Sequence, residues 1–95
     1  MKRLTAYASG RVQRTGYRAR AIEMAKAFGL RGFVQNLDDG RVKIVAEGEE
    51  EDLRRFADAV KIRDSLINVV SFSEEYSPAT GDFDRFYKLV ERGET

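Results

Sequence analysis

The chain has 95 residues, of which 42% are apolar and 35% charged, a composition typical of a globular protein with one domain, residues 1–95. It contains no cysteine and no histidine, which excludes disulfides, thiol nucleophiles, histidine bases and most zinc or iron sites. Because no apolar run approaches the length of a membrane span and no secretory signal is present, we expect a cytoplasmic protein without a membrane partner.

The first half of the chain alternates between strand and helix patterns. Residues 4–9 alternate in polarity, which predicts a strand. Residues 17–30 have helical spacing, with apolar positions at Tyr17, Ala21, Met24, Ala25 and Phe28. Residues 33–35 and 42–47 are β-rich runs joined by an Asn/Asp/Gly segment, so they predict a β-hairpin.

The second half supplies one more helix and two strands. Residues 49–62 predict a helix with acidic residues in its first turn and an apolar stripe of Leu53, Phe56, Ala57 and Val60. Residues 66–76, rich in Ile, Val and Phe, predict a fourth strand. Residues 85–90 predict a short last strand, and residues 92–95 a frayed tail.

The order of these elements indicates the fold class. Strand, helix, strand, strand, helix and strand is the split βαβ arrangement. We therefore predict an α+β, ferredoxin-like βαββαβ sandwich, an antiparallel sheet with two helices on one face. We expect four aromatic residues in its core: Phe28, Phe33, Phe56 and Phe72. This fold supports many functions, so it determines none by itself.

The turn between the first strand and the first helix combines glycines with arginines. Residues 10–18 read Gly-Arg-Val-Gln-Arg-Thr-Gly-Tyr-Arg. Backbone N–H groups before a helix attract an anion, and the Arg18 fork fits two phosphate oxygens. Residues 1–35 carry eight bases and one acid, whereas residues 36–95 carry nine bases and fifteen acids. The positive excess around this turn suits a small anionic substrate, and it also suits nucleic acid.

A second stretch, at residues 32–42, places Asn36 at the end of the second predicted strand. Taken alone, the first turn can be a solvated loop and Asn36 a turn former. Together, Gly-x-Val-Gln-x-x-x-Tyr-Arg at residues 10–18 and Gly-Phe-Val-x-Asn-x-x-Asp-Gly-x-Val at residues 32–42 resemble the two signatures of the acylphosphatase family. Their spacing also agrees, and the resemblance covers essentially the whole chain.

The resemblance implies hydrolysis of small acyl phosphates to a carboxylate and inorganic phosphate, without a metal or cofactor. Arg18 would hold the phosphoryl oxygens with the N–H groups of residues 14–18, and Asn36 would orient the attacking water. The phosphate-binding loop would comprise Gln13, Arg14, Thr15, Gly16, Tyr17 and Arg18. Positioning and charge can suffice for this chemistry because the leaving group is good. We expect the protein to act as a monomer.

The chain departs from the family pattern at Arg14 and Thr15, where Gly-Val is usual. An arginine in place of the glycine either adopts a left-handed conformation at a cost or shifts the loop. Gln13 and Thr15 can hydrogen-bond the substrate or shape the loop, and the sequence leaves both roles open.

The alternative is a non-catalytic domain on the same fold that binds a phosphorylated ligand or RNA. The RNA version depends on Arg31-Gly-Phe-Val, which faintly resembles an aromatic RNA-binding motif, with Tyr7 as its partner. Because the similarity stops at Gln35, we favour an acyl phosphate over nucleic acid.

Overall fold

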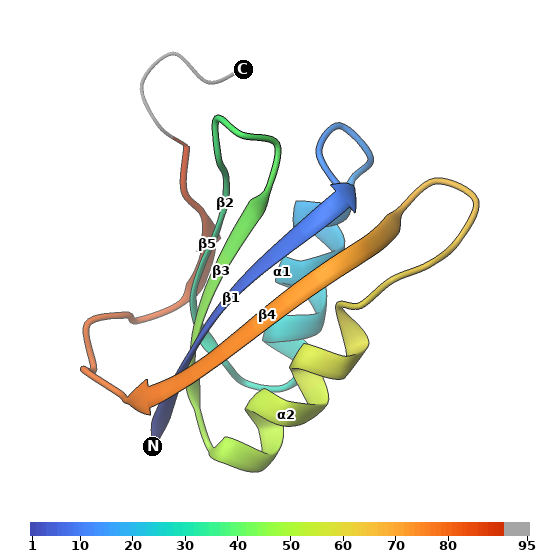
Figure 1. Ribbon diagram of the computed structural model, residues 1–95. Helices are drawn as coiled ribbons and strands as arrows, with labels where there is room; N and C mark the ends of the chain where they lie inside the picture. The colour runs from blue at the N-terminus through green and yellow to red at the C-terminus, as the bar shows by residue number, and fades with distance from the viewer. Residues whose placement is uncertain (91–95) are drawn as a thin grey trace.

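The structure, a computed structural model, describes residues 1–90 of the chain. In chain order its elements are β1 (Lys2–Arg11), α1 (Tyr17–Ala27), β2 (Arg31–Asn36), β3 (Val42–Gly48), α2 (Glu50–Ala59), β4 (Asn68–Pro78) and β5 (Phe86–Lys88). The strands form one sheet in the order β4-β1-β3-β2-β5, and α1 and α2 lie on the same face of it (Figure 1). The predicted ferredoxin-like α+β fold is confirmed.

The sheet is mixed, so the prediction of a purely antiparallel sheet is wrong for its last strand. β1 pairs antiparallel with β3 and β4, and β2 pairs antiparallel with β3. β5 pairs with β2 in parallel, through Gly32–Phe86, Phe33–Tyr87 and Val34–Lys88. The chain crosses from one edge of the sheet (β4) to the other (β5), so β5 enters in the direction of β2. β1, β2 and β5 therefore end at the same end of the sheet.

Both helices are shorter than predicted. α1 ends at Ala27 because Gly29 adopts a left-handed conformation, with φ of 71°. The N–H of Gly29 donates to the Lys26 carbonyl (3.0 Å), and that of Leu30 donates to the Ala25 carbonyl (2.9 Å), as in a Schellman cap. α2 ends at Ala59 rather than at residue 62, and the last strand covers only Phe86–Lys88. The predicted frayed tail, residues 92–95, lies outside the described residues.

The core lies between the sheet and the two helices. The alternating side chains Leu4, Ala6 and Ala8 of β1 are fully buried. The predicted stripe of α2 is also fully buried, namely Leu53, Phe56, Ala57 and Val60. Phe28 and Phe72 are partly buried and pack against this core. Within residues 1–90, no helix has the length and apolar composition needed to cross a membrane.

Phe33 does not belong to this core, and its prediction as a core residue is wrong. Neighbouring residues of a strand face opposite sides of the sheet, and Val34 faces the helices and is fully buried. Phe33 instead packs on the other face against Phe83 and Tyr87, with ring centroids 5.9 and 6.1 Å away. Residues 79–85 fold over this side of the sheet and supply Phe83.

Candidate active site

The residues of the two sequence motifs meet at one end of the sheet. The C-terminal ends of β1, β2 and β5 lie there, because these three strands run in the same direction. The loop of residues 12–16 leaves β1 at this end and leads into α1, which contacts β2 and β5. The ends of β2 and β5 therefore lie at the same end of the sheet as the first turn of α1 (Figure 1).

Two residues in the left-handed backbone conformation redirect the chain from this loop into α1. Gly16, the residue before α1, has φ of 82°, and Arg14 has φ of 64°. Within residues 1–90, Arg14 is the one non-glycine residue with positive φ. No side chain caps the N-terminus of α1, so its first N–H groups remain available to an anion.

The side chains of Gln13 and Thr15 shape the loop. The Gln13 amide Nε2 donates to the carbonyls of Leu37 (2.8 Å) and Arg41 (2.9 Å), which belong to the β2–β3 hairpin. The Thr15 hydroxyl donates to the Val12 carbonyl at 2.7 Å. Gln13 thus joins the loop to the hairpin that begins after Asn36, a link that the sequence motifs do not reveal.

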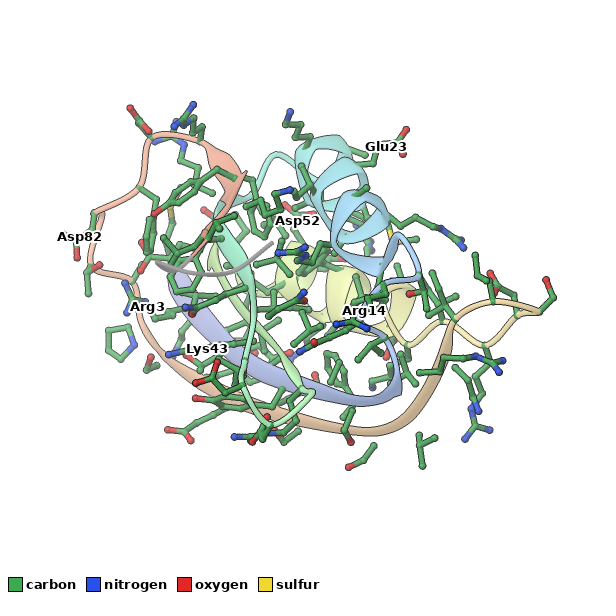
Figure 2. All side chains as sticks on the ribbon, turned by 90° about the horizontal axis from the view of Figure 1, so that it is seen from above. Arg3, Arg14, Glu23, Lys43, Asp52 and Asp82 are labelled. Atoms are coloured by element: carbon green, nitrogen blue, oxygen red, sulfur yellow. The ribbon has the colours of Figure 1, made fainter. Side chains whose placement is uncertain are left out.

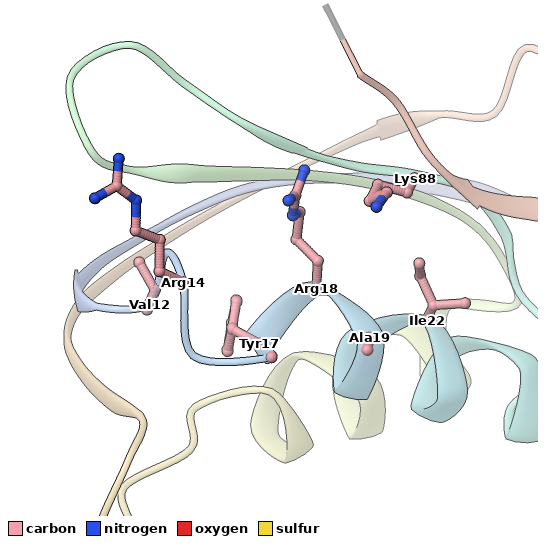
Figure 3. Close-up of a pocket in the computed structure, with 8 residues that line it drawn as sticks. Val12, Arg14, Tyr17, Arg18, Ala19, Ile22 and Lys88 are labelled. Atoms are coloured by element: carbon pink, nitrogen blue, oxygen red, sulfur yellow. The ribbon is translucent and has the colours of Figure 1, made fainter. Parts of the chain in front are cut away.

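A pocket of about 290 Å³ opens between the loop, α1 and β5 (Figure 3). Arg14, Arg18 and Lys88 line it, and no acidic residue does so within the described part of the chain. In Figure 3 the Arg18 guanidinium extends from the first turn of α1 toward the strands, beside Lys88. Glu23, the only acid of residues 1–35, lies on α1 away from Arg14 (Figure 2). The described lining of the pocket therefore carries three cations and no acid.

The wall of the pocket is apolar. Val12, Tyr17, Ala19 and Ile22 contribute to it. Tyr17 is fully buried, and its hydroxyl donates to the Val60 carbonyl at 2.8 Å, which anchors the start of α1 to the end of α2. Burial raises the pKa of the Tyr17 hydroxyl far above its ordinary value. This hydroxyl therefore stays protonated and serves the core.

Asn36 lies at the end of β2, on the side of the sheet that faces the helices. Val34, two residues earlier on the same side, is fully buried, and Asn36 pairs with Val42 of β3. The Asn36 Oδ1 atom is buried and has no hydrogen-bond partner, the one such side-chain atom within residues 1–90. A buried acceptor without a partner is costly, and such groups are commonly satisfied by water.

The structure thus brings four of the predicted loop residues to the pocket: Arg14, Gly16, Tyr17 and Arg18. Gln13, Thr15 and Asn36 are close by in the fold but do not line it. Lys88 does line it and was missed by sequence reasoning, because only the parallel pairing of β5 with β2 brings it there. In the described residues, no group of His, Cys, Asp and Glu is arranged to hold a metal ion.

Fold and site together define a class, the small ferredoxin-like α+β domains with a cationic pocket at a helix N-terminus. Residues 4–88 match the sequence profile of the acylphosphatase family, described as Acylphosphatase. The chain belongs to the acylphosphatase family.

Individual relatives agree with this assignment. The chain is 42% identical to an acylphosphatase of Thermus thermophilus, over 85% of this chain and 92% of the relative. It is 39% identical to an acylphosphatase of Deinococcus radiodurans, over 83% and 91% of the two chains. The crystal structure of acylphosphatase from Bacillus subtilis matches with a TM-score of 0.89 and 36% identity, over 94% of this chain and 99% of that one. The predicted enzyme class, an acylphosphatase, is confirmed at this level.

Proposed function

We propose that this enzyme hydrolyses small acyl phosphates in the pocket before α1. Water attacks the phosphorus atom, the bond from phosphorus to the acyl oxygen breaks, and a carboxylate and inorganic phosphate leave. The observation that carries this proposal is the pocket itself, where Arg18 and the uncapped start of α1 line one cavity without an acid among the described residues.

Arg18 binds the phosphoryl group in this mechanism. Its planar guanidinium donates to two phosphoryl oxygens, and the N–H groups of residues 14–18 approach from the loop. Charge spreads over these oxygens in the transition state, so fixed donors lower the barrier without any proton transfer. The left-handed conformations of Arg14 and Gly16 support this role because they turn the loop toward the helix start.

Asn36 positions the attacking water. Its Oδ1 atom lacks a partner, and a water molecule that donates a hydrogen to it would satisfy this acceptor. The same water would then face the phosphoryl group held at the start of α1. A carboxylate is a good leaving group, so an orienting amide suffices and no histidine or cysteine is needed. We expect this reaction to need no cofactor and to proceed in a cytoplasmic monomer.

Hydrolysis of benzoyl phosphate, followed by its ultraviolet absorbance, tests the proposal. Arg18→Ala is expected to lose activity on the order of 10²–10³-fold while the protein stays folded, and Arg18→Lys to recover little of it. Arg20→Ala is the matched control, because Arg20 lies on the same helix but pairs with Asp64 outside the pocket. An Arg18→Ala variant that keeps most of its activity overturns the mechanism. Phosphate binding without turnover by the unmodified protein supports the non-catalytic alternative.

A further inference from the structure

Lys88 occupies the part of the pocket that lies farther along α1 than the phosphate site. Arg14, Gly16 and Arg18 form the end next to the loop, whereas Ile22 lies one helical turn beyond Arg18. In the view of Figure 3, Lys88 lies on the Ile22 side of Arg18 and Arg14 lies on the other side. A phosphoryl group held at the loop would therefore direct the rest of its molecule toward Lys88.

The backbone of β5 fixes the position of Lys88. Lys88 pairs with Val34 in the parallel ladder, and the next N–H, of Leu89, donates to the Val34 carbonyl at 2.9 Å. The side chain itself is exposed, and within residues 1–90 it makes neither a hydrogen bond nor an ion pair. Among the described residues, Lys88 thus presents to the pocket a cation that no other side chain neutralises.

The described lining of the pocket carries three cations, Arg14, Arg18 and Lys88, of which Arg18 is the one assigned to the phosphoryl group. Like charges that line the same cavity repel one another, and the described lining residues contain no acid to offset them. Ala19 and Ile22 line the same pocket and provide an apolar surface that fits a carbon skeleton. The volume of about 290 Å³ is near the lower end for small-molecule sites, so a compact acyl group fits.

We propose that Lys88 binds an anionic group on the acyl part of the substrate, an inference that rests on the proposed function. The enzyme then favours acyl phosphates that carry a second negative charge, such as a carboxylate, at the end remote from the phosphoryl group. Arg18 holds the phosphoryl group of such a molecule, Lys88 holds its second anionic group, and Ala19 and Ile22 contact its carbon skeleton.

A pair of substrates that differ only in this charge tests the proposal. The probes are benzoyl phosphate and its meta- and para-carboxy derivatives, and the quantity measured is the ratio of their kcat/KM values. The unmodified enzyme is expected to favour one carboxy derivative. Lys88→Met is expected to lower kcat/KM for that derivative about threefold to tenfold more than it lowers kcat/KM for benzoyl phosphate. Lys88→Glu is expected to reverse the preference.

Lys26→Met is the matched control, because Lys26 is an exposed lysine of α1 that does not line the pocket. If Lys26→Met has the same effect as Lys88→Met, the preference is a long-range effect of net charge and the proposal is wrong. A Lys88→Met variant that slows all probes equally assigns Lys88 to the phosphate site and also overturns the proposal. So does a variant that alters none of them.

Turnover of benzoyl phosphate by the unmodified enzyme separates this test from that of the proposed function. If benzoyl phosphate is hydrolysed and the ratio does not depend on Lys88, only the present inference fails. If neither benzoyl phosphate nor its carboxy derivatives are hydrolysed, the proposed function fails and the inference fails with it.

Discussion

Arg14 holds a backbone conformation that glycine adopts more easily. Of the two outcomes open from the sequence, the structure shows the first: the loop keeps a left-handed residue, with φ of 64°, at the position where the family usually has glycine. The left-handed conformation costs a residue with a Cβ atom about 1–2 kcal/mol. The charged side chain remains at the pocket, so the strain and the added charge occur at the same residue.

Arg14→Gly separates these two effects. Relief of strain outweighs the greater chain entropy of unfolded glycine, so the free energy of unfolding is expected to rise by ~0.5–1 kcal/mol. The affinity for inorganic phosphate is expected to fall, most clearly at low salt, because a cation is lost. Denaturant unfolding and competitive inhibition by phosphate measure the two quantities. Arg14→Ala is the control, since it loses the charge and keeps the strain. A less stable Arg14→Gly variant would contradict this account.

Asn36→Ala distinguishes a functional asparagine from a turn former. The substitution removes a buried acceptor that has no partner, and such an atom costs about 1–3 kcal/mol. Stability is therefore expected to hold or rise slightly, while kcat falls on the order of 10²-fold and KM changes little. Asn68→Ala is the control, an asparagine of β4 that has no buried side-chain acceptor without a partner among the described residues. Lower stability with unchanged specific activity would make Asn36 a turn residue only.

At the scale of the elements, hydrogen bonds from side chains to the backbone of other segments hold the ends of the sheet together. Gln13 joins the loop before α1 to the β2–β3 hairpin. At β3, the buried Glu47 carboxylate accepts hydrogen bonds from Arg3 Nε (2.7 Å), Thr80 N (3.0 Å) and Gly81 N (3.0 Å). It therefore holds Thr80 and Gly81, at the start of the connection that leads to β5 and to Lys88.

The pKa of Glu47 makes these hydrogen bonds sensitive to acid. Burial raises this pKa, but the bonds from Thr80, Arg3 and Gly81 together outweigh burial and bring it below the ordinary value of 4.5. A carboxyl with a lowered pKa stabilises the folded protein at neutral pH. That contribution is lost as the pH falls from the unfolded value through the lowered folded one.

Glu47→Gln is expected to lose about 1–3 kcal/mol at neutral pH, because the new amide NH₂ replaces an acceptor and leaves a backbone N–H unpaired. Its stability is also expected to fall less steeply than that of the unmodified protein between about pH 5 and pH 3. Denaturant unfolding at several pH values measures both effects. Glu75→Gln, on an exposed residue of β4, is the control and should follow the unmodified protein. If the stability of Glu47→Gln falls with decreasing pH as steeply as that of the unmodified protein, the proposed role of the Glu47 carboxylate is wrong.

At the scale of the whole molecule, the resolved pKa shifts move groups away from neutral pH. Burial and the neighbouring Glu74 raise the pKa of Tyr76 to about 12, and the hydrogen bond to Glu74 raises that of Lys61. Backbone hydrogen bonds lower the pKa values of Asp39 and Asp64. The chain contains no histidine or cysteine to titrate between these limits.

Activity on benzoyl phosphate is therefore expected to show a plateau around neutral pH, limited by the ionisation of the substrate phosphate. It is also expected to survive treatment with EDTA. Rates measured from about pH 5 to pH 9, with and without chelator, check both expectations. A sharp optimum near pH 7 would contradict the first expectation. A loss of activity in EDTA that added magnesium restores would contradict the second.

The sequence by itself determined the order of the elements and the faces of most of them. The α2 stripe of Leu53, Phe56, Ala57 and Val60 is fully buried because helical spacing alone places these side chains on one face. The loop residues of the candidate site, Arg14 and Arg18, follow equally from a local motif. These features can be predicted from the sequence because they depend on residues close together in the chain, through side-chain periodicity and turn-forming residues.

Only the tertiary structure decided how distant segments meet. The parallel pairing of β5 with β2 brings Lys88 to the pocket, and residues 79–85 cover Phe33 on the opposite face of the sheet. The conformation of Arg14 is likewise imposed by the loop rather than preferred by arginine. The partner of an edge strand, the covering of a sheet face and the strain in a loop depend on contacts between residues far apart in the chain, which no local pattern records.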